Sequence, residues 1–544
     1  MSRLPRARLR LLLFLVLLVS TFYPRLVLLG SLPAMDEGYY GWQAHEMYEY
    51  LLQGRALPAG ALNLYPLLLC WLCALPGKTM LWFRAADLVV ALVSAWLFCG
   101  CILRKSGAPY AGLAIAFVFL CAMNMEPVIN GGFKNSIAAA WIPIFVALSL
   151  YHEDCPATSP RWYFMGALLA VATLLREPFF LFALLGCAPV AFLGGLRALA
   201  RYVAGGLCAG CLIILPVCLA HENFGDVFRA YFQATDVYTI QAGRVFHNFV
   251  ANGWMGAKLF ICPIFLTLAG LILSWRAFPE STGQTRGPAM AESALAQSGR
   301  RRFFYENIFW MAAFLLPLLE PLLKIGFLYH FAVALPGLGI FCALRWSCIP
   351  CALFTERKYL LRLLLAGPAL ASLFFLPPIT GMGDSLENIA AIGEQSWAEP
   401  QAAASNTLHV ARIIQQNLEK GATVSSSGFT YFLYGASGFY PPLHGPFAEV
   451  DRHRLSDLSR SFRALGASPE KLATALRLNP PDIIVIARAI SHHEPDHHEE
   501  LEKAVNMTGL YSPLATVPPA PAKNYGWLGY KIFKKTGEGP QTTP

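Results

Sequence analysis

The sequence predicts a polytopic α-helical membrane protein with a small α/β domain at its C-terminal end. Three observations lead to this fold class. Of the 544 residues, 56% are hydrophobic and only 14% are charged, which is the composition of a chain that lies mostly in a bilayer. Over roughly the first 380 residues, long apolar runs alternate with short basic clusters. Beyond Pro378 the composition becomes that of a soluble domain.

About eleven membrane-spanning helices account for the apolar runs, at about 20 residues for each span. The first, Leu11–Leu29, is long enough to span and no clear small-residue cleavage site follows it, so we expect a retained helix rather than a signal peptide. A shorter apolar segment, Leu64–Leu75, indicates an interfacial helix within a long outer loop. The remaining spans are expected at Phe83–Leu103, Tyr110–Met125, Ser136–Tyr151, Tyr163–Leu175, Phe179–Phe192, Tyr202–Ala220, Ala257–Trp275, Ile308–Leu323, Tyr329–Leu344 and Tyr359–Pro377.

The charges of the loops predict the topology of these spans. With a cytoplasmic N-terminus, the inner loops should be basic, and they carry Arg104, Lys105, Arg161, Arg197, Arg201, Arg276, Arg300–Arg302, Arg345, Arg357, Lys358 and Arg362. We therefore expect a multi-pass protein of the cytoplasmic (inner) membrane, with residues 1–380 as the membrane domain, 31–82 as its first outer loop and 276–304 as a cytoplasmic linker. An odd number of spans puts the α/β domain, 381–544, outside. The net charge of +9 follows from the inner loops, so no nucleic-acid partner is expected.

Alternating helices and strands are expected in the C-terminal region. A helix over Thr407–Lys420 leads to a strand at Thr423–Ser426, and a second helix begins at Ser468-Pro469. The apolar run Asp482–Ile486 is typical of a strand buried in a parallel sheet, and the last strand is expected at Tyr530–Phe533. The polar run Ser491–Glu500 contains metal-ligand residue types, but its spacing fixes no geometry, so we interpret it as a solvated loop.

Two adjacent carboxylates, Asp36 and Glu37, follow the outer end of the first helix. Carboxylates at a membrane surface can simply be solvated. A carboxylate within hydrogen-bond reach of a hydroxyl can also remove its proton during a transfer reaction. Both interpretations are open at this point.

The surrounding segment, Met35–Leu57 with Tyr65–Leu68 and Trp71, resembles the first extracytoplasmic loop of the GT-C membrane glycosyltransferases. This superfamily includes protein O-mannosyltransferases and the aminoarabinose transferases of lipid A. Further similarities follow in the same order along the chain, at Arg84-Ala85-Ala86, Thr173–Pro178, Lys324 with Tyr329 and Phe331, Leu335-Pro336-Gly337, Ser427–Tyr434 and Pro481–Val485, the last two being similar to the outer α/β domain of many bacterial members.

The resemblance implies an inverting glycosyltransferase that takes a sugar from a polyprenyl-phosphate donor. The acceptor would be a lipid, a glycan or a protein on the outer face of the bilayer. By the same match Asp36 is the general base, and Glu37 either orients Asp36 or the acceptor or helps to hold a divalent metal ion, which some members use. No other cofactor is expected.

Cations near the lipid phosphate would stabilise the charge that builds on the leaving group. Arg84, Arg176 and Lys324, with Tyr329, are the candidates for binding the donor phosphate. Snorkelling to the interface is the alternative for each cation. Glu126 is the candidate for a second acid, on the second outer loop.

The chain departs from the family pattern at two places. Leu64-Tyr65-Pro66 replaces the Lys-containing motif of many bacterial members, and the second outer loop has Glu126 where an Asp is common. Two alternatives therefore stay open: a transporter or flippase for a lipid-linked glycan, and a degenerate relative that serves as an assembly subunit. A transporter should carry charges at mid-span and show repeated halves, and no such repeat is present in the sequence.

Overall fold

The structure is a computed structural model, and it places the chain in two compact units. It describes residues 6–29, 35–54, 64–75, 79–125, 136–150, 156–219, 245–277, 306–319, 321–322, 328–349, 357–374, 376, 409–410, 412–414, 416–417, 423–427, 458, 462, 465–490, 497–522 and 526–536. The first unit, here the helical unit, comprises residues 1–29, 47–72 and 81–385. The second, here the sheet unit, comprises 30–46, 73–80 and 386–544.

The helical unit begins with a helical run of three parts: α1 (Arg6–Leu17), the π-helix η1 (Leu18–Phe22) and α2 (Tyr23–Leu29). Helix α3 (Met35–Leu52) contributes residues to both units. The other labelled elements are α4 (Leu64–Leu69), η3 (Cys70–Ala74), α5 (Thr79–Ser106), α6 (Pro109–Met123), α8 (Ser136–Leu150), α9 (Arg161–Leu175), η4 (Glu177–Phe179), α10 (Phe180–Leu219), α12 (Val245–Ala277), α14 (Leu328–Phe331), η7 (Ala332–Ala334), α15 (Leu335–Ser347) and α17 (Lys358–Leu373).

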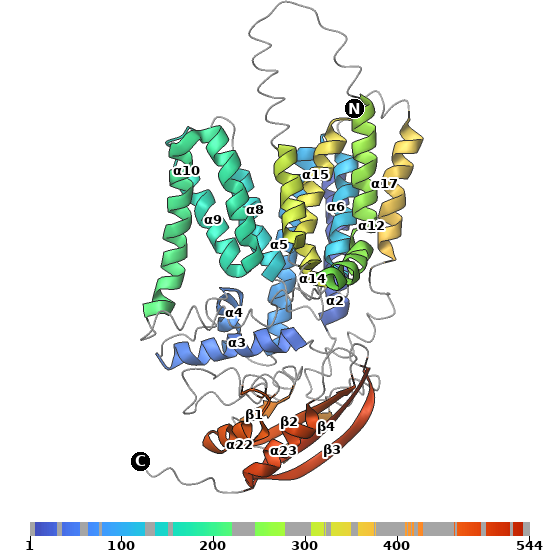
Figure 1. The fold of residues 1–544 in the computed structure, drawn as a ribbon. Helices are drawn as coiled ribbons and strands as arrows, with labels where there is room; N and C mark the ends of the chain where they lie inside the picture. The colour runs from blue at the N-terminus through green and yellow to red at the C-terminus, as the bar shows by residue number, and fades with distance from the viewer. Residues whose placement is uncertain are drawn as a thin grey trace, which may run out of the picture. The chain divides into compact units, whose positions relative to one another are not determined.

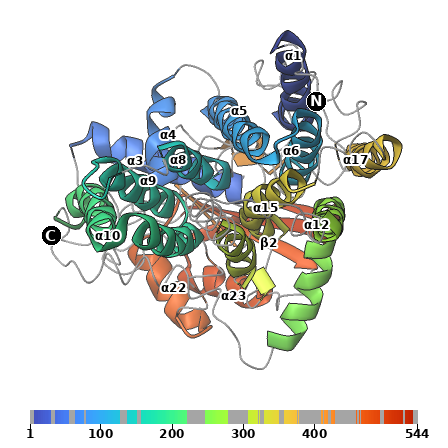
Figure 2. The same cartoon turned by 90° about the horizontal axis from the view of Figure 1, so that it is seen from above.

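Two groups of packed helices can be described in this unit. Helix α9 packs against α8 and α10, while α6 packs against α12, α15 and α17; Figure 1 and the view from above in Figure 2 show the two groups. Phe98 of α5 joins them, because its ring lies 6.5 Å from that of Phe119 on α6 and 5.9 Å from that of Phe145 on α8.

Within the described residues, three helices are long and apolar enough to cross a membrane: Ala7–Val27, Trp82–Ser106 and Gly194–Pro216. Shorter apolar helices include Pro109–Met123, Arg161–Leu175 and Ala332–Ser347. Together they indicate association with a membrane. The expected total of about eleven spans stays a prediction, and the expected linker lies outside the described residues apart from its first two positions, which end α12.

Several helix boundaries differ from the expectation. Helix α12 begins at Val245 and not at Ala257, and several basic residues expected in inner loops lie within helices, among them Arg104, Lys105, Arg161 and Arg345. The span expected to begin at Tyr202 begins directly after Gly195, so Arg197 and Arg201, expected in a loop, are helical. Gly195 has a φ of +70°, a conformation that glycine adopts readily. The chain therefore turns within a single residue, and no longer loop is needed.

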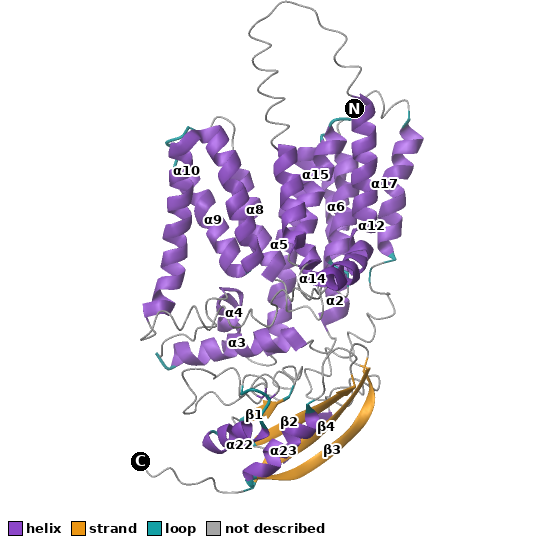
Figure 3. Ribbon diagram, in the orientation of Figure 1, coloured by secondary structure: helices purple, strands orange, loops and turns teal. Residues whose placement is uncertain are grey.

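The described residues of the sheet unit form a mixed sheet of four strands, shown in orange in Figure 3. Its elements in chain order are β1 (Val424–Ser426), α22 (Pro469–Leu478), β2 (Ile483–Ile490), α23 (His498–Thr508), β3 (Tyr511–Ala522) and β4 (Gly526–Lys535). The spatial order is β1-β2-β4-β3, with β1 parallel to β2 and the other two pairs antiparallel. The helix expected after the Ser468 cap is present, and the backbone N–H of Lys471 donates to Ser468 Oγ at 3.3 Å.

Strand β2 is buried on both faces, which explains its continuous apolar sequence. Ile484 and Ile486 lie in a core cluster with Leu476 of α22 and Val505 of α23. On the opposite face, Ile483 and Val485 are also fully buried.

Two parts of the sheet unit differ from the expectations. Strand β3 was not expected, because its prolines, among them Pro513 and Pro519, weaken a strand pattern; it is an edge strand of the described sheet, where proline is tolerated. The end of the supposed loop Ser491–Glu500 is helical, since His498, Glu499 and Glu500 form the first turn of α23. Acidic residues are favourable in the first turn of a helix, and Leu501, Ala504, Val505 and Thr508 supply the buried face.

Candidate functional site

A cluster of buried polar side chains, centred on Asp87 of α5, occupies the helical unit. Asp87 is 0% exposed and its carboxylate forms an ion pair with Arg25 of α2, which is 5% exposed. The hydroxyl of Tyr65 on α4 donates a hydrogen bond to the other carboxylate oxygen, Asp87 Oδ1, at 2.6 Å. Three segments that are far apart in sequence thus meet at one carboxylate.

Asn124, at the end of α6, extends the cluster. Its Oδ1 accepts a hydrogen bond from Arg25 Nε at 3.0 Å, and its Nδ2 donates to the carbonyl of Leu120 at 2.8 Å and to Thr21 Oγ1 at 3.4 Å. Arg25 therefore contacts a carboxylate and an amide at once. We call Thr21, Arg25, Tyr65, Asp87 and Asn124 the Asp87 cluster.

The first helical run brings Thr21 and Arg25 to this cluster through its π-helical segment. Ser20 and Thr21 are fully buried within η1, and the Ser20 hydroxyl donates to the carbonyl of Val16 at 2.6 Å. Pro24 follows, and it has no N–H to donate to the preceding turn. Short π-helical segments are frequent at functional sites.

Buried charges in a membrane helix are costly, at about 2.5–3.5 kcal/mol for an Arg or Asp at mid-bilayer on insertion scales. In the apolar helix Ala7–Val27, Arg25 lies in the last turn, and in Trp82–Ser106 Asp87 lies in the second turn. The cost is therefore lower than at mid-span, and pairing lowers it further. A cluster of this kind is a default candidate for a functional site in a membrane protein.

Arg84, a candidate for phosphate binding, lies one turn before Asp87 on α5 and is only 3% exposed. Residues three apart on a helix share a face. Arg84 is therefore placed next to the Asp87 cluster, and not on a solvated surface as a simple interfacial anchor would be.

Arg176, the second candidate, lies where the helical chain breaks. Helix α9 ends at Leu175, and Arg176 is its C-cap with an extended backbone (φ −161°, ψ 126°). Its N–H still donates to the carbonyl of Ala172 at 3.0 Å, and η4 follows, with Pro178 in its first turn. The break expected at Arg176-Glu177-Pro178 is thus confirmed, and the side chain of Glu177 is exposed.

Helix α4 contacts α9 and the helix that carries Arg84. Tyr65 of α4 is hydrogen-bonded to Asp87 of α5, the helix that carries Arg84. The same short helix also packs against α9, which ends directly before Arg176.

The structure describes the other expected site residues only in part. Asp36 and Glu37 lie in the first turn of α3, and Tyr329 lies in α14, but the side chains of all three are outside the described residues. Lys324 and Glu126 are outside them altogether. Their roles as base, metal-holding group, phosphate ligand or second acid stay predictions.

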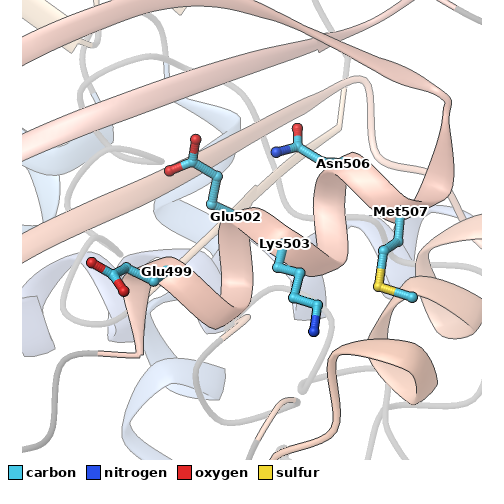
Figure 4. A pocket seen from close by; sticks show the side chains of 5 residues that line it. All are labelled: Glu499, Glu502, Lys503, Asn506 and Met507. Carbon is cyan, nitrogen blue, oxygen red and sulfur yellow. The ribbon is translucent and has the colours of Figure 1, made fainter.

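Within the described ranges, no group of three or more His, Cys, Asp or Glu side chains is arranged to hold a metal ion. The described hollow in the sheet unit is lined by Glu499, Glu502, Lys503, Asn506 and Met507 (Figure 4). All five residues belong to α23, so a ligand there would have no second wall from another described element.

Sequence reasoning missed Arg25 and Asp87. A signal for both was present, because Arg25 interrupts the first apolar run and Asp87 is the only acidic residue between Trp82 and Ser106. Opposite charges inside two spans point to a pair. Tyr65 was noted only as part of the first outer loop, and nothing local in the sequence links it to Asp87.

Comparison with known proteins adds no identification: no family model matches the chain, and a search of curated proteins gives no match.

Proposed function

We propose that this protein is a membrane glycosyltransferase of the GT-C type, which transfers a sugar from a polyprenyl-phosphate donor to an acceptor on the outer face of the membrane. Asp36 acts as the general base, with Glu37 beside it in the sequence. Arg84 and Arg176, with Lys324 and Tyr329, bind the donor phosphate. Glu126 is the candidate second acid. Holding a divalent metal ion is a second role proposed for the Glu37 carboxylate.

The placement of charged residues at the ends of apolar helices is the observation that carries the proposal. Arg25 and Asp87 lie near the ends of apolar helices, and Arg176 lies directly after one. A lipid phosphate resides at this depth, where the hydrocarbon gives way to the headgroups. A transporter would instead place such groups at the midplane of the bilayer, on the path of its substrate.

The transfer reaction requires a base at one point of the reacting centre and cations at another. As the bond between the acceptor oxygen and C1 of the sugar forms, the base takes the proton of the acceptor hydroxyl. The bond between C1 and the phosphate oxygen breaks, and the negative charge passes to the polyprenyl phosphate. Fixed guanidinium groups stabilise this charge.

The test uses the purified full-length protein in nanodiscs with a panel of polyprenyl-phosphate sugars. We expect the release of polyprenyl phosphate from at least one donor in the presence of a mixed lipid, glycan and protein acceptor pool. Asp36→Asn should abolish release, while Glu49→Gln, which alters another carboxylate of α3, should leave it intact. If Asp36→Asn is fully active, Asp36 is not the base; if no donor is consumed, the proposed activity is wrong.

We further infer an inner-membrane topology in which the N-terminus is cytoplasmic and the C-terminal region is periplasmic. The support is the excess of Lys and Arg in alternate loops. A reporter that is active only in the cytoplasm should be silent when fused after Pro544. A strong signal from that fusion would contradict the topology.

A further inference from the structure

Helix α4 is too short to be stable by itself. It has only six residues, Leu64–Leu69, and isolated helices shorter than about 12 residues are marginal in water even with good helix formers. Tertiary contacts must therefore hold it in place. Leu64, Tyr65, Pro66 and Leu69 are buried, while Leu68 is 57% exposed.

Among the described residues, two attachments hold α4 in the helical unit. One is polar: the Tyr65 hydroxyl donates to Asp87 Oδ1. The other is the packing of α4 against α9. The segment η3 follows directly, and its first residue, Cys70, is 0% exposed.

Arg25 fixes the direction of the Asp87 carboxylate. The Arg25 guanidinium pairs with Asp87 Oδ2, and Arg25 Nε donates a hydrogen bond to Asn124 Oδ1 at 3.0 Å. Oδ1 is thereby turned toward Tyr65. The carboxylate is thus a fixed acceptor between the helices and α4, and its burial excludes water that would compete for the Tyr65 hydroxyl.

We propose that Asp87 is a positioning residue: through Tyr65 it holds α4 against α9, so that α4 supports the chain at the helix break that carries Arg176. This inference deepens the proposed function, and only its activity readout rests on that function. Asp87 itself takes no part in the chemical step. Loss of the Tyr65 contact should release α4 and η3 together, while the rest of the helical unit stays folded.

The first test measures the alkylation of individual cysteines by N-ethylmaleimide in the full-length protein, resolved by peptide mass spectrometry. Tyr65→Phe removes one hydroxyl and leaves the pair of Arg25 and Asp87 in place. A hydrogen bond to a charged group contributes about 1.5–3 kcal/mol, so Cys70 should react about tenfold faster or more. Cys121 of α6 and Cys342 of α15, both free and 0% exposed, report on unfolding and should react as slowly as in the parent.

Glu306→Gln is the control for the loss of a polar contact elsewhere in the helical unit, because it weakens the pair of Lys105 and Glu306 at 2.9 Å. It should leave Cys70 protected. If Tyr65→Phe also leaves Cys70 protected, the inference is wrong. If all three cysteines become reactive together, Tyr65 maintains the fold in general, which equally overturns a positioning role.

The second test is kinetic. With α4 released, the site at the helix break loses its support, so Tyr65→Phe should raise KM for the lipid donor about tenfold, with a smaller change in kcat. An unchanged KM despite a reactive Cys70 would overturn the link to Arg176. If Cys70 becomes reactive and the parent protein consumes no donor, the attachment of α4 is supported and the proposed function has failed.

Discussion

The helical unit and the sheet unit fill their interiors differently. In the helical unit, the carboxylate of Asp87 is buried together with a guanidinium, an amide and a phenol. In the sheet unit, the core between β2, α22 and α23 consists of apolar side chains, and the polar group Asp482 stands at the start of β2, where it accepts hydrogen bonds from the N–H and the hydroxyl of Thr423, both at 2.8 Å.

This difference between the two interiors indicates two roles of a buried polar group, one structural and one functional. Asp482 stabilises the junction of two strands, which any folded sheet requires. The Asp87 cluster contributes no more to stability than well-packed apolar residues could. The attraction between the two charges of a buried ion pair rarely exceeds the free energy that their desolvation costs. The apolar core therefore stabilises the sheet unit. We expect the functional groups in the helical unit.

The largest expected effect comes from breaking the ion pair. Asp87→Ala leaves the Arg25 guanidinium buried without its carboxylate, and we expect a loss of about 3–5 kcal/mol in the free energy of unfolding. Equilibrium unfolding in mixed micelles measures it. The double variant Arg25→Met with Asp87→Asn removes both charges of the pair and should recover much of the loss. A single variant as stable as the parent would show that the pair is not buried in the membrane-embedded protein.

The corresponding change in the sheet unit is Ile484→Ala. Ile484 is fully buried in the core cluster, and truncation of a buried Ile costs about 2–5 kcal/mol. The β-sheet band of the infrared amide I spectrum, followed during heating, should melt at a clearly lower temperature. Leu478→Ala, on the same helix as Leu476 but 47% exposed, should hardly shift that band; an equal shift for both would argue against the described core.

A third prediction concerns the packing of α9 on α10, which depends on backbone contact. A Cβ at Gly166 would lie 1.8 Å from the carbonyl oxygen of Tyr202, so Gly166→Ala must push the helices apart. We expect a loss at or above the usual overpacking cost of about 1–3 kcal/mol, measured in the same mixed micelles. Gly210→Ala on α10 meets nothing within 4 Å and should be neutral or slightly stabilising, since a helix favours Ala over Gly. Equal stability of the two variants would contradict the close helix contact.

The smallest expected effect depends on pH and belongs to the sheet unit. Burial, with the charge of Asp482 as a second cause, raises the pKa of Tyr511 above its ordinary value of 10.0, and the hydroxyl donates to the carbonyl of Pro481 at 3.0 Å. A raised pKa in the folded state means that this stabilisation is complete below pH 10 and is lost as the pH rises above it. The melting temperature of the β-sheet band should therefore fall from pH 9 to 11, and fall less for Tyr511→Phe. Identical slopes would remove Tyr511 as the cause.

Local signals in the sequence predicted a large part of the fold. The cap at Ser468-Pro469 and the apolar run after Asp482 marked α22 and β2, and the short apolar segment after Leu64 marked α4 as an element too brief to span. Strand β3 was not predicted, because its prolines weaken the strand pattern. The acidic first turn of α23 was interpreted as a loop. For β3, tertiary context outweighs local propensity, whereas for α23 a local helix signal was present and was overlooked.

Less of the candidate site than of the fold could be predicted from the sequence. Arg84 and Arg176 were identified as isolated cations, and the structure shows what surrounds them: a buried position one turn from Asp87, and the C-cap of α9. The contact of Tyr65 with Asp87 joins residues 22 positions apart, and no periodicity indicates such a pairing. A local pattern identifies charged residues inside apolar runs, but it does not reveal their partners.

Binding of sugar-free polyprenyl phosphate to the full-length protein in nanodiscs tests most directly whether the charges of the helical unit serve a ligand. We expect Arg176→Ala to weaken binding about tenfold or more, the loss of a charge-assisted contact, and Arg176→Lys to weaken it only partly. Arg477→Ala is the matched control, since this exposed arginine of the sheet unit donates to the carbonyl of Thr508 at 3.3 Å, and it should bind like the parent. If all three variants bind the lipid phosphate as the parent does, Arg176 is an interfacial anchor and the account of the helical unit as the donor site is contradicted.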